Sequence, residues 1–204
     1  MALDTYDNLK TTITSWMSAR TDIAAEVDDF IDMTEADVNR LLRVREMETS
    51  ATSTPDSSGQ FTLPSDYLEY RALISTRNPR RPLALIDPLM AEHRFGYRES
   101  DLPNFFTIIG TTVTILPVDT TDVLLLYYQK LTALDDTDTS NWLLAKSPNT
   151  YLFGCIRYAA EWIGDFSHAD RMEARFQQEI AKLNSDDKGQ RYARAAVMSQ
   201  GQKP

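Results

Sequence analysis

Few side chains in this sequence are of the types that usually carry out chemistry. The chain holds two histidines, His93 and His168, and one cysteine, Cys155. One cysteine cannot build a thiolate zinc site, and no histidine pair stands at helical spacing, so the common metal sites are not indicated. The seven glycines form no phosphate-binding loop, and no Gly-x-Ser-x-Gly motif occurs. We therefore predict no catalytic residues, no cofactor and no metal.

The histidines and the cysteine are interpreted as structural. His168 falls in the first turn of a predicted helix and His93 near the end of a short one. Cys155 lies among the apolar residues of a third helix, with no visible neighbour that would lower the pKa of its thiol. A buried, unreactive thiol is therefore the favoured interpretation, over a nucleophile.

An acidic run, "EVDDFIDMTEADVNR" (residues 26–40), could suggest calcium binding. It lacks the fixed oxygen spacing and the central glycine of an EF-hand loop. A solvated acidic face on two capped helices is the preferred alternative. The letters "TEAD" (34–37) have the form of a capping box, which predicts that a helix begins there.

Three arginines are concentrated in "STRNPRRPL" (75–83), where the chain is expected to turn between two strands. Arg77, Arg80 and Arg81 could bind a phosphate backbone or an acidic protein partner. An exposed hairpin turn also favours such residues, so the alternative is a solvated turn without a partner. We interpret the three arginines as a partner contact.

The elements that position these residues fall into three segments. Apolar residues at helical spacing predict helices over residues 5–45 and again over 148–184, the latter as an antiparallel helical hairpin. "ETSATSTPDSSGQ" (48–60) is typical of a loop or a hairpin tip. Residues 67–75 alternate as a half-buried strand, with Leu68, Tyr70, Ala72 and Ile74 inward, and residues 105–129 predict a three-stranded antiparallel meander.

The predicted fold class is α+β and mainly α: a helical bundle with an inserted antiparallel β ribbon or meander and an extended C-terminal tail. Residues 1–184 form a single domain, in which helices over 5–45 and 148–184 surround a β-rich insertion at 46–130. Residues 185–204 form a flexible tail, because their few apolar side chains bury too little surface to fold alone.

The charge balance limits the classes of partner. A net charge of −9 and a pI near 4.7 argue against a free-standing nucleic-acid binder, which normally needs a basic face. They do not exclude a surface that nucleic acid passes without sticking. No apolar run approaches about 18 residues, so no membrane partner is expected.

The order of three motifs resembles the head-to-tail adaptor proteins of tailed bacteriophages, also called connector or collar proteins. The motifs are "LPSDYLEYRAL" (63–73), "FTIIGTTVTILPVDTTDVLLLYYQKLTAL" (106–134) and "TSNWLLAKSPNTYLFGCIRYAAEWIGD" (139–165). Each motif alone is a common turn or cap, and their order and spacing carry the resemblance. It extends over roughly residues 1–185.

The resemblance implies an assembly role and no catalysis. Such adaptors form a ring, usually of twelve copies, beneath the portal protein of the DNA-filled head, and they present the docking surface for the tail or nozzle protein. DNA would pass through the channel without specific binding. The expected location is the virion, at the neck, after synthesis in the host cytoplasm. A tail-completion or tail-terminator protein is the alternative within the virion, and a small hydrolase is the alternative outside it.

In that family a C-terminal extension often reaches the portal. Here the tail contains "RYARAAVM" (191–198), which would form a short helix when it binds a portal or a neighbouring copy. The partner-contact residues predicted in this segment are Tyr192, Arg194, Val197 and Met198.

Overall fold

The computed structural model describes residues 3–95 and 102–198, with side chains for 3–93 and 102–189. The chain divides into two compact units. Residues 1–46 and 131–204 form one, called here the helical unit, and residues 47–130 form the other, called the sheet unit. No described helix is both long and apolar enough to cross a membrane.

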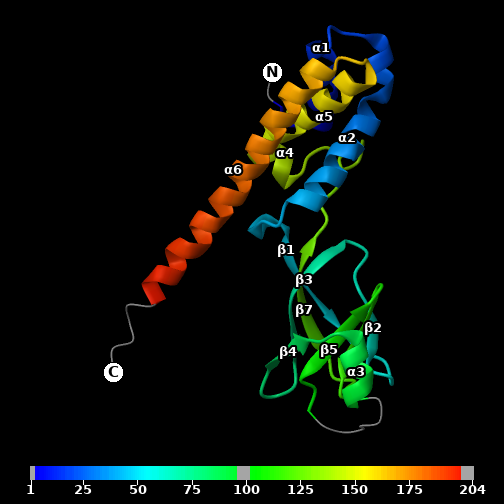
Figure 1. Cartoon of the computed structure of the whole chain (residues 1–204), viewed down its shortest axis with the longest axis vertical. Helices are drawn as coiled ribbons and strands as arrows, with labels where there is room; N and C mark the ends of the chain where they lie inside the picture. Colours follow the sequence, from blue (N-terminus) through cyan, green and yellow to red (C-terminus); the bar gives the residue numbers. More distant parts are fainter. Residues whose placement is uncertain (1–2, 96–101, 199–204) are drawn as a thin grey trace. The chain divides into compact units, whose positions relative to one another are not determined.

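The helical unit is arranged around one central helix, α5 (Pro148–Trp162), which packs against four others. Figure 1 shows α5 beside α6 and surrounded by the remaining helices of the unit. These are α1 (Tyr6–Trp16), α2 (Thr21–Leu41), α4 (Trp142–Lys146) and α6 (Phe166–Met198). A proline at the first position of α5 and a Ser147 N-cap begin this helix where the sequence predicts it.

Small residues allow α5 to occupy the centre. Gly154 has no side chain, and a Cβ atom there would lie 2.4 Å from Cγ2 of Thr34 on α2 and 3.3 Å from Cδ2 of Phe176 on α6. Ala159 and Ala160 are also fully buried. The helix backbones can therefore approach α5 from two sides at once.

The "TEAD" motif does not begin a helix, because α2 continues through it without a break. The hydroxyl of Thr34 donates to the carbonyl of Phe30, 2.8 Å away in the preceding turn, so it does not cap free backbone N–H groups. Thr34 and Glu35 are both buried. The apolar stripe that starts at Ile23 runs on to Val38, and burial of this stripe outweighs the local capping signal.

The backbone of α6 remains helical to Met198, so the expectation of an extended tail after residue 184 is wrong. Residues 184–198 contain no proline, and seven of the fifteen are alanine, arginine, lysine or glutamine, which are good helix formers. A helix already nucleated against α5 adds such residues at little cost.

The sheet unit is larger than the predicted ribbon, and the expectation of a helical bundle with a small β insertion is therefore wrong. Seven strands form one mixed sheet in the order β1-β7-β3-β4-β5-β6-β2. They are β1 (Glu48–Ser53), β2 (Gln60–Thr62), β3 (Tyr67–Ser75), β4 (Arg81–Leu85), β5 (Phe105–Ile109), β6 (Thr112–Leu116) and β7 (Val123–Gln129).

The predicted three-stranded meander is also wrong. β5 and β6 do pair as a hairpin, but β7 lies between β1 and β3 instead of beside β6. The sequence of β7, "VLLLYYQ", is rich in residues that favour strands, and β7 pairs along both of its edges, with β1 and with β3. Its partner β1 occupies half of the segment that the sequence suggested was a loop.

The sheet must curl, because its two edge strands are joined by residues 54–59 alone. In a flat sheet, seven strands would place β1 and β2 about 29 Å apart. The connection could span at most about 25 Å if fully extended, and it contains a turn closed by Gly59 N and Asp56 O at 2.9 Å. The strands therefore form a half-barrel.

The set of β3 residues that points into the core changes along the strand. The predicted inward set included Ala72 and Ile74, but Leu73 and Ser75 are the fully buried residues at this end. A β-bulge between Tyr70 and Ala72 shifts the register against β7 by one residue. One extra residue reverses which side chains point inward beyond that point.

A single helix, α3 (Pro88–Phe95), connects the parallel strands β4 and β5 and packs on β5. Asp87 caps it, since its Oδ1 accepts the Leu89 N–H at 2.8 Å, as the Asp-Pro pair predicts. The core of the sheet unit is formed by Phe61, Leu63, Leu73, Leu83, Phe106, Val113, Ile115, Val123, Leu125 and Tyr127.

Candidate interaction surfaces

The groups that could carry out chemistry are dispersed or enclosed. Among the residues that the structure describes, His, Cys, Asp and Glu do not gather in threes or more in a way that could hold a metal ion. Cys155 is fully buried, with its Sγ 3.5 Å from the Thr34 hydroxyl. Burial raises the pKa of the thiol to about 12, so it stays protonated and unreactive at neutral pH.

One carboxylate of the acidic run, Glu35, points into the helical unit instead of into solvent. Its Oε1 accepts the phenolic hydrogen of Tyr151 at 2.8 Å and the Leu134 N–H at 3.0 Å. Asn141 donates in turn to the Tyr151 oxygen at 2.7 Å. Burial raises the pKa of Glu35 to about 7. Glu35 lines none of the cavities described below. The cluster has a structural role, because its hydrogen bonds join α2, α5 and the segment 131–141.

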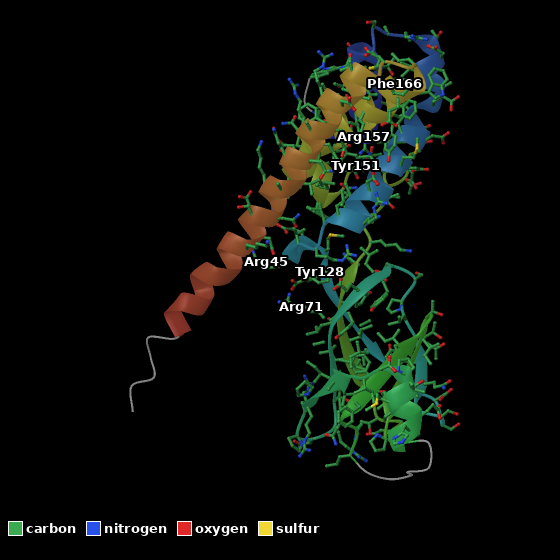
Figure 2. All side chains as sticks on the ribbon, viewed as in Figure 1. Arg45, Arg71, Tyr128, Tyr151, Arg157 and Phe166 are labelled. Atoms are coloured by element: carbon green, nitrogen blue, oxygen red, sulfur yellow. The ribbon has the colours of Figure 1, made fainter. Side chains whose placement is uncertain are left out.

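A second buried cluster joins α2, α5 and α6 around Arg157, which Figure 2 labels within the helical unit. Its guanidinium binds Asp37 at 2.5 Å and also Glu173, and it stacks 4.1 Å from the ring centroid of Tyr158. Burial works against ionisation of Asp37, but hydrogen bonds from Tyr158 and Arg157 outweigh it and lower the pKa of that carboxyl. This cluster is structural, because each charge is matched by a partner.

Two of the three predicted arginines meet at one small cavity. Arg77 and Arg80 lie in the connection between β3 and β4, and Arg81 begins β4. A cavity of about 80 Å³ is lined by Ser75, Arg77, Asn78, Pro79, Arg81, Leu102 and Pro103. Arg80, which precedes Arg81 in the sequence, is exposed and does not line this cavity. We call residues 76–81 the arginine turn.

Only Arg77 of the arginine turn has an acidic partner in the described parts of the chain. Its Nη1 lies 3.6 Å from Oδ2 of Asp119, a side chain that is 9% exposed. Arg80 and Arg81 are exposed and make no ion pair with a described residue. Within the described part of the chain, the positive charges of Arg80 and Arg81 therefore have no matching carboxylate.

Two further cavities lie in the sheet unit. One of about 610 Å³ is open and lies over β1, β7 and β3, where Arg71 pairs with Glu48. The other, of about 200 Å³, lies between α3 and strands β2, β5 and β6. The hydroxyl of Thr107, which lines it, is buried and has no hydrogen-bond partner among the described residues.

Three large aromatic side chains are exposed at the turns of one end of the helical unit, and this end is called here the aromatic tip. Trp16 ends α1, Trp162 ends α5 and Phe166 begins α6, and they are 48%, 51% and 68% exposed. Figure 1 shows the α1–α2 and α5–α6 turns at the same end of this unit, and Figure 2 labels Phe166 there. Soluble monomers seldom leave several large aromatic residues exposed together, so the tip is a candidate contact surface.

The sheet unit has its own exposed apolar residues near α3. Leu89 and Met90 on this helix are 77% and 50% exposed. Leu85 at the end of β4 and Ile109 at the end of β5 are 44% and 62% exposed. Each unit therefore carries apolar surface without a partner in the described chain.

The four residues predicted in the tail lie on the backbone of α6, which includes Tyr192, Arg194, Val197 and Met198. Their side chains are outside the described residues.

Sequence reasoning missed Glu35, Arg157 and the aromatic tip as features of the protein. Glu35 was detectable, because it stands four residues after Ile31 and three before Val38 on the buried stripe of α2.

Comparison with known proteins supports the assembly interpretation. The family model described as SU10 adaptor protein matches residues 4–199, which include both units. No curated protein matches the chain.

Proposed function

The chain belongs to the SU10 adaptor protein family, a family of phage head-to-tail adaptors, and we propose that copies of it form a ring that joins the portal of a DNA-filled head to the tail. The observation that carries this proposal is the extent of the family match, residues 4–199. The coarser conclusion, that the protein is a structural adaptor of a bacteriophage, follows from membership itself.

The exposed apolar surfaces support assembly with other protein chains. A ring of identical copies needs two different surfaces on each copy, because the contacts are head-to-tail. The aromatic tip and the apolar residues around α3 lie on separate units and are both unpartnered in the described chain. Burial of such surface between copies would supply most of the free energy of association. Twelve copies are the expected number.

The long last helix supports a contact with the portal. α6 has 33 residues and α5 has 15, which correspond to about 50 and 22 Å of helix. The last residue of α6 described as buried is Asp187. Beyond it, residues 188–198 contain three basic residues, no acidic ones and a small apolar group. We assign portal binding to this segment, with Tyr192, Arg194, Val197 and Met198 as the contact residues.

The charge of the chain supports passage of DNA without specific binding. Each copy brings a formal charge of −9 to a ring. A channel wall of net negative charge repels the phosphates of the genome, so DNA slides instead of adhering. The other end of the ring would present the docking surface for the tail or nozzle protein, at the neck of the virion.

The test is direct imaging of purified chain mixed with portal particles. Electron microscopy should show a ring of copies at one end of the portal. A variant shortened after Asp187 should keep both compact units and lose portal binding. A chain that leaves portal particles bare would refute the proposed function, and a shortened variant that binds like the full chain would refute the role of the last segment of α6.

A further inference from the structure

The arginine turn is built to receive a carboxylate. Arg77 and Arg81 approach one cavity of about 80 Å³, and Pro79, Leu102 and Pro103 form part of its wall. Guanidinium groups bind carboxylates through two parallel hydrogen bonds, and an apolar wall strengthens such pairs by excluding water. The cavity has room for the end of an acidic side chain and is too small for a nucleotide.

The surrounding charge favours a protein partner over nucleic acid. Residues 47–130 contain ten acidic and seven basic residues, so the sheet unit as a whole repels DNA. Three of these seven basic residues lie together in the arginine turn. A local basic site in an acidic unit matches a local acidic site on another protein surface better than it matches an extended phosphate backbone.

Helix α2 offers such an acidic surface on every copy of this chain. It has seven acidic residues and one basic residue, Arg40. Asp22 is paired with Arg20 and Asp28 with Lys10. Glu26, Asp29 and Asp32, by contrast, make no ion pair or hydrogen bond with any described residue, and the latter two are exposed. These three carboxylates repel one another along one side of the helix, and a cation from another protein surface would relieve that repulsion.

From this complementarity we infer that the arginine turn of one copy binds the outer face of α2, formed by Glu26, Asp29 and Asp32, on a neighbouring copy. The inference rests on the proposed self-assembly and names two surfaces that meet in it. Arg80 and Arg81, which make no ion pair with a described residue, bind the carboxylates of this face, while Arg77 at the same cavity is paired with Asp119. Because the two surfaces differ, the contact is head-to-tail and can repeat from copy to copy.

Charge exchange between full-length variants tests the contact. R80E/R81E reverses the charge of the arginine turn, and D29K/D32K reverses the charge of the outer face of α2. Sedimentation velocity at low ionic strength should show concentration-dependent association of the unmodified chain. Each variant alone should have a dissociation constant raised by about tenfold or more, because like charges then face each other. Added salt should weaken association of the unmodified chain.

An equimolar mixture of the two variants should regain association. In the mixture the negative turn of one variant meets the positive helix of the other, and the remaining pair keeps the original charges. Regained association also shows that both variants are folded. R171E/R175E on α6 lowers the net charge by the same amount as R80E/R81E and serves as its control. Its association should be unchanged.

Several outcomes would overturn the inference: an unmodified chain that stays monomeric under these conditions, single variants that associate like it, or a mixture that does not recover. The turn would be assigned to nucleic acid instead if the unmodified chain binds labelled duplex DNA, R80E/R81E does not, and the mixture of variants does not regain association. Portal imaging separates the two proposals. Variants that still form rings on the portal like the unmodified chain refute this contact and leave the adaptor function standing.

Discussion

Tyr151 on α5 donates its phenolic hydrogen to Glu35 on α2 across 2.8 Å in the interior of the helical unit. The same carboxylate oxygen accepts the Leu134 N–H, so one side chain holds two helices and the segment that leads into α4. A carboxylate in this position is costly when ionised, because burial removes its hydration. The protein therefore carries a pH-sensitive group in its core.

The pH dependence of stability should reveal this group. The folded-state pKa of Glu35, about 7, is above the ordinary value of 4.5, so the folded chain binds this proton more tightly than the unfolded chain does. The stabilisation is fully present below pH 4.5 and is lost as the pH rises through 7. We expect the loss to be on the order of 3 kcal/mol.

Urea unfolding of the unmodified chain and of E35Q across pH 4.5–8 measures this term. The difference between their unfolding free energies should shift in favour of E35Q as the pH rises, because glutamine keeps an acceptor oxygen and cannot ionise. D29N, which changes an exposed carboxylate, should follow the unmodified chain. Parallel curves for E35Q and the unmodified chain would contradict the assignment.

Removal of Arg157 should destabilise the helical unit strongly. R157A leaves Asp37 and Glu173 without their shared cation, and we expect a loss of about 3–5 kcal/mol in the free energy of unfolding. R157K keeps the charge but cannot bind both carboxylates with one planar group, so its loss should be intermediate. Chemical denaturation measures both, and R175A on the exposed side of α6 is the control. A loss under about 1 kcal/mol for R157A would show that the cluster is dispensable.

Two glycine-to-alanine changes in helices should have opposite effects. In G154A the new Cβ would lie 2.4 Å from Thr34, so we expect a loss of about 1–3 kcal/mol. In G189A the new Cβ meets nothing within 4 Å, and the higher helix propensity of alanine should add up to about 1 kcal/mol. Thermal unfolding of the two variants checks both signs. T34S, which removes the methyl group nearest the new Cβ, should recover part of the loss in G154A.

Two phenylalanines of α6 should separate folding from assembly. Phe166 is 68% exposed, so F166S should change the unfolding free energy by no more than about 0.5 kcal/mol and still reduce binding to copies or to the portal. Phe176 is fully buried, and F176A should cost about 3–5 kcal/mol. Calorimetry together with portal binding distinguishes the two. Unchanged assembly of F166S would remove the aromatic tip from the candidate surfaces.

Part of this architecture follows from local sequence. The helix begun at Pro148 and the Asp87–Pro88 start of α3 lie where caps and apolar spacing predict them, because both signals act within one or two turns. The arginine turn was likewise visible as a basic cluster between two strands. The family was identified from the order of motifs, and the family match confirms it.

The remaining features were decided by contacts between distant residues. Glu35 has a capping sequence around it, but 116 residues separate it from the Tyr151 hydroxyl that it binds. β7 follows β6 in the chain but pairs with β1 and β3, so its place in the sheet is set by strands that are distant from it in the sequence. Spacing along the chain determines helices and turns, because those hydrogen bonds are local. Strand order and buried charge depend on which distant surfaces together exclude the most water, and only the tertiary structure contains that information.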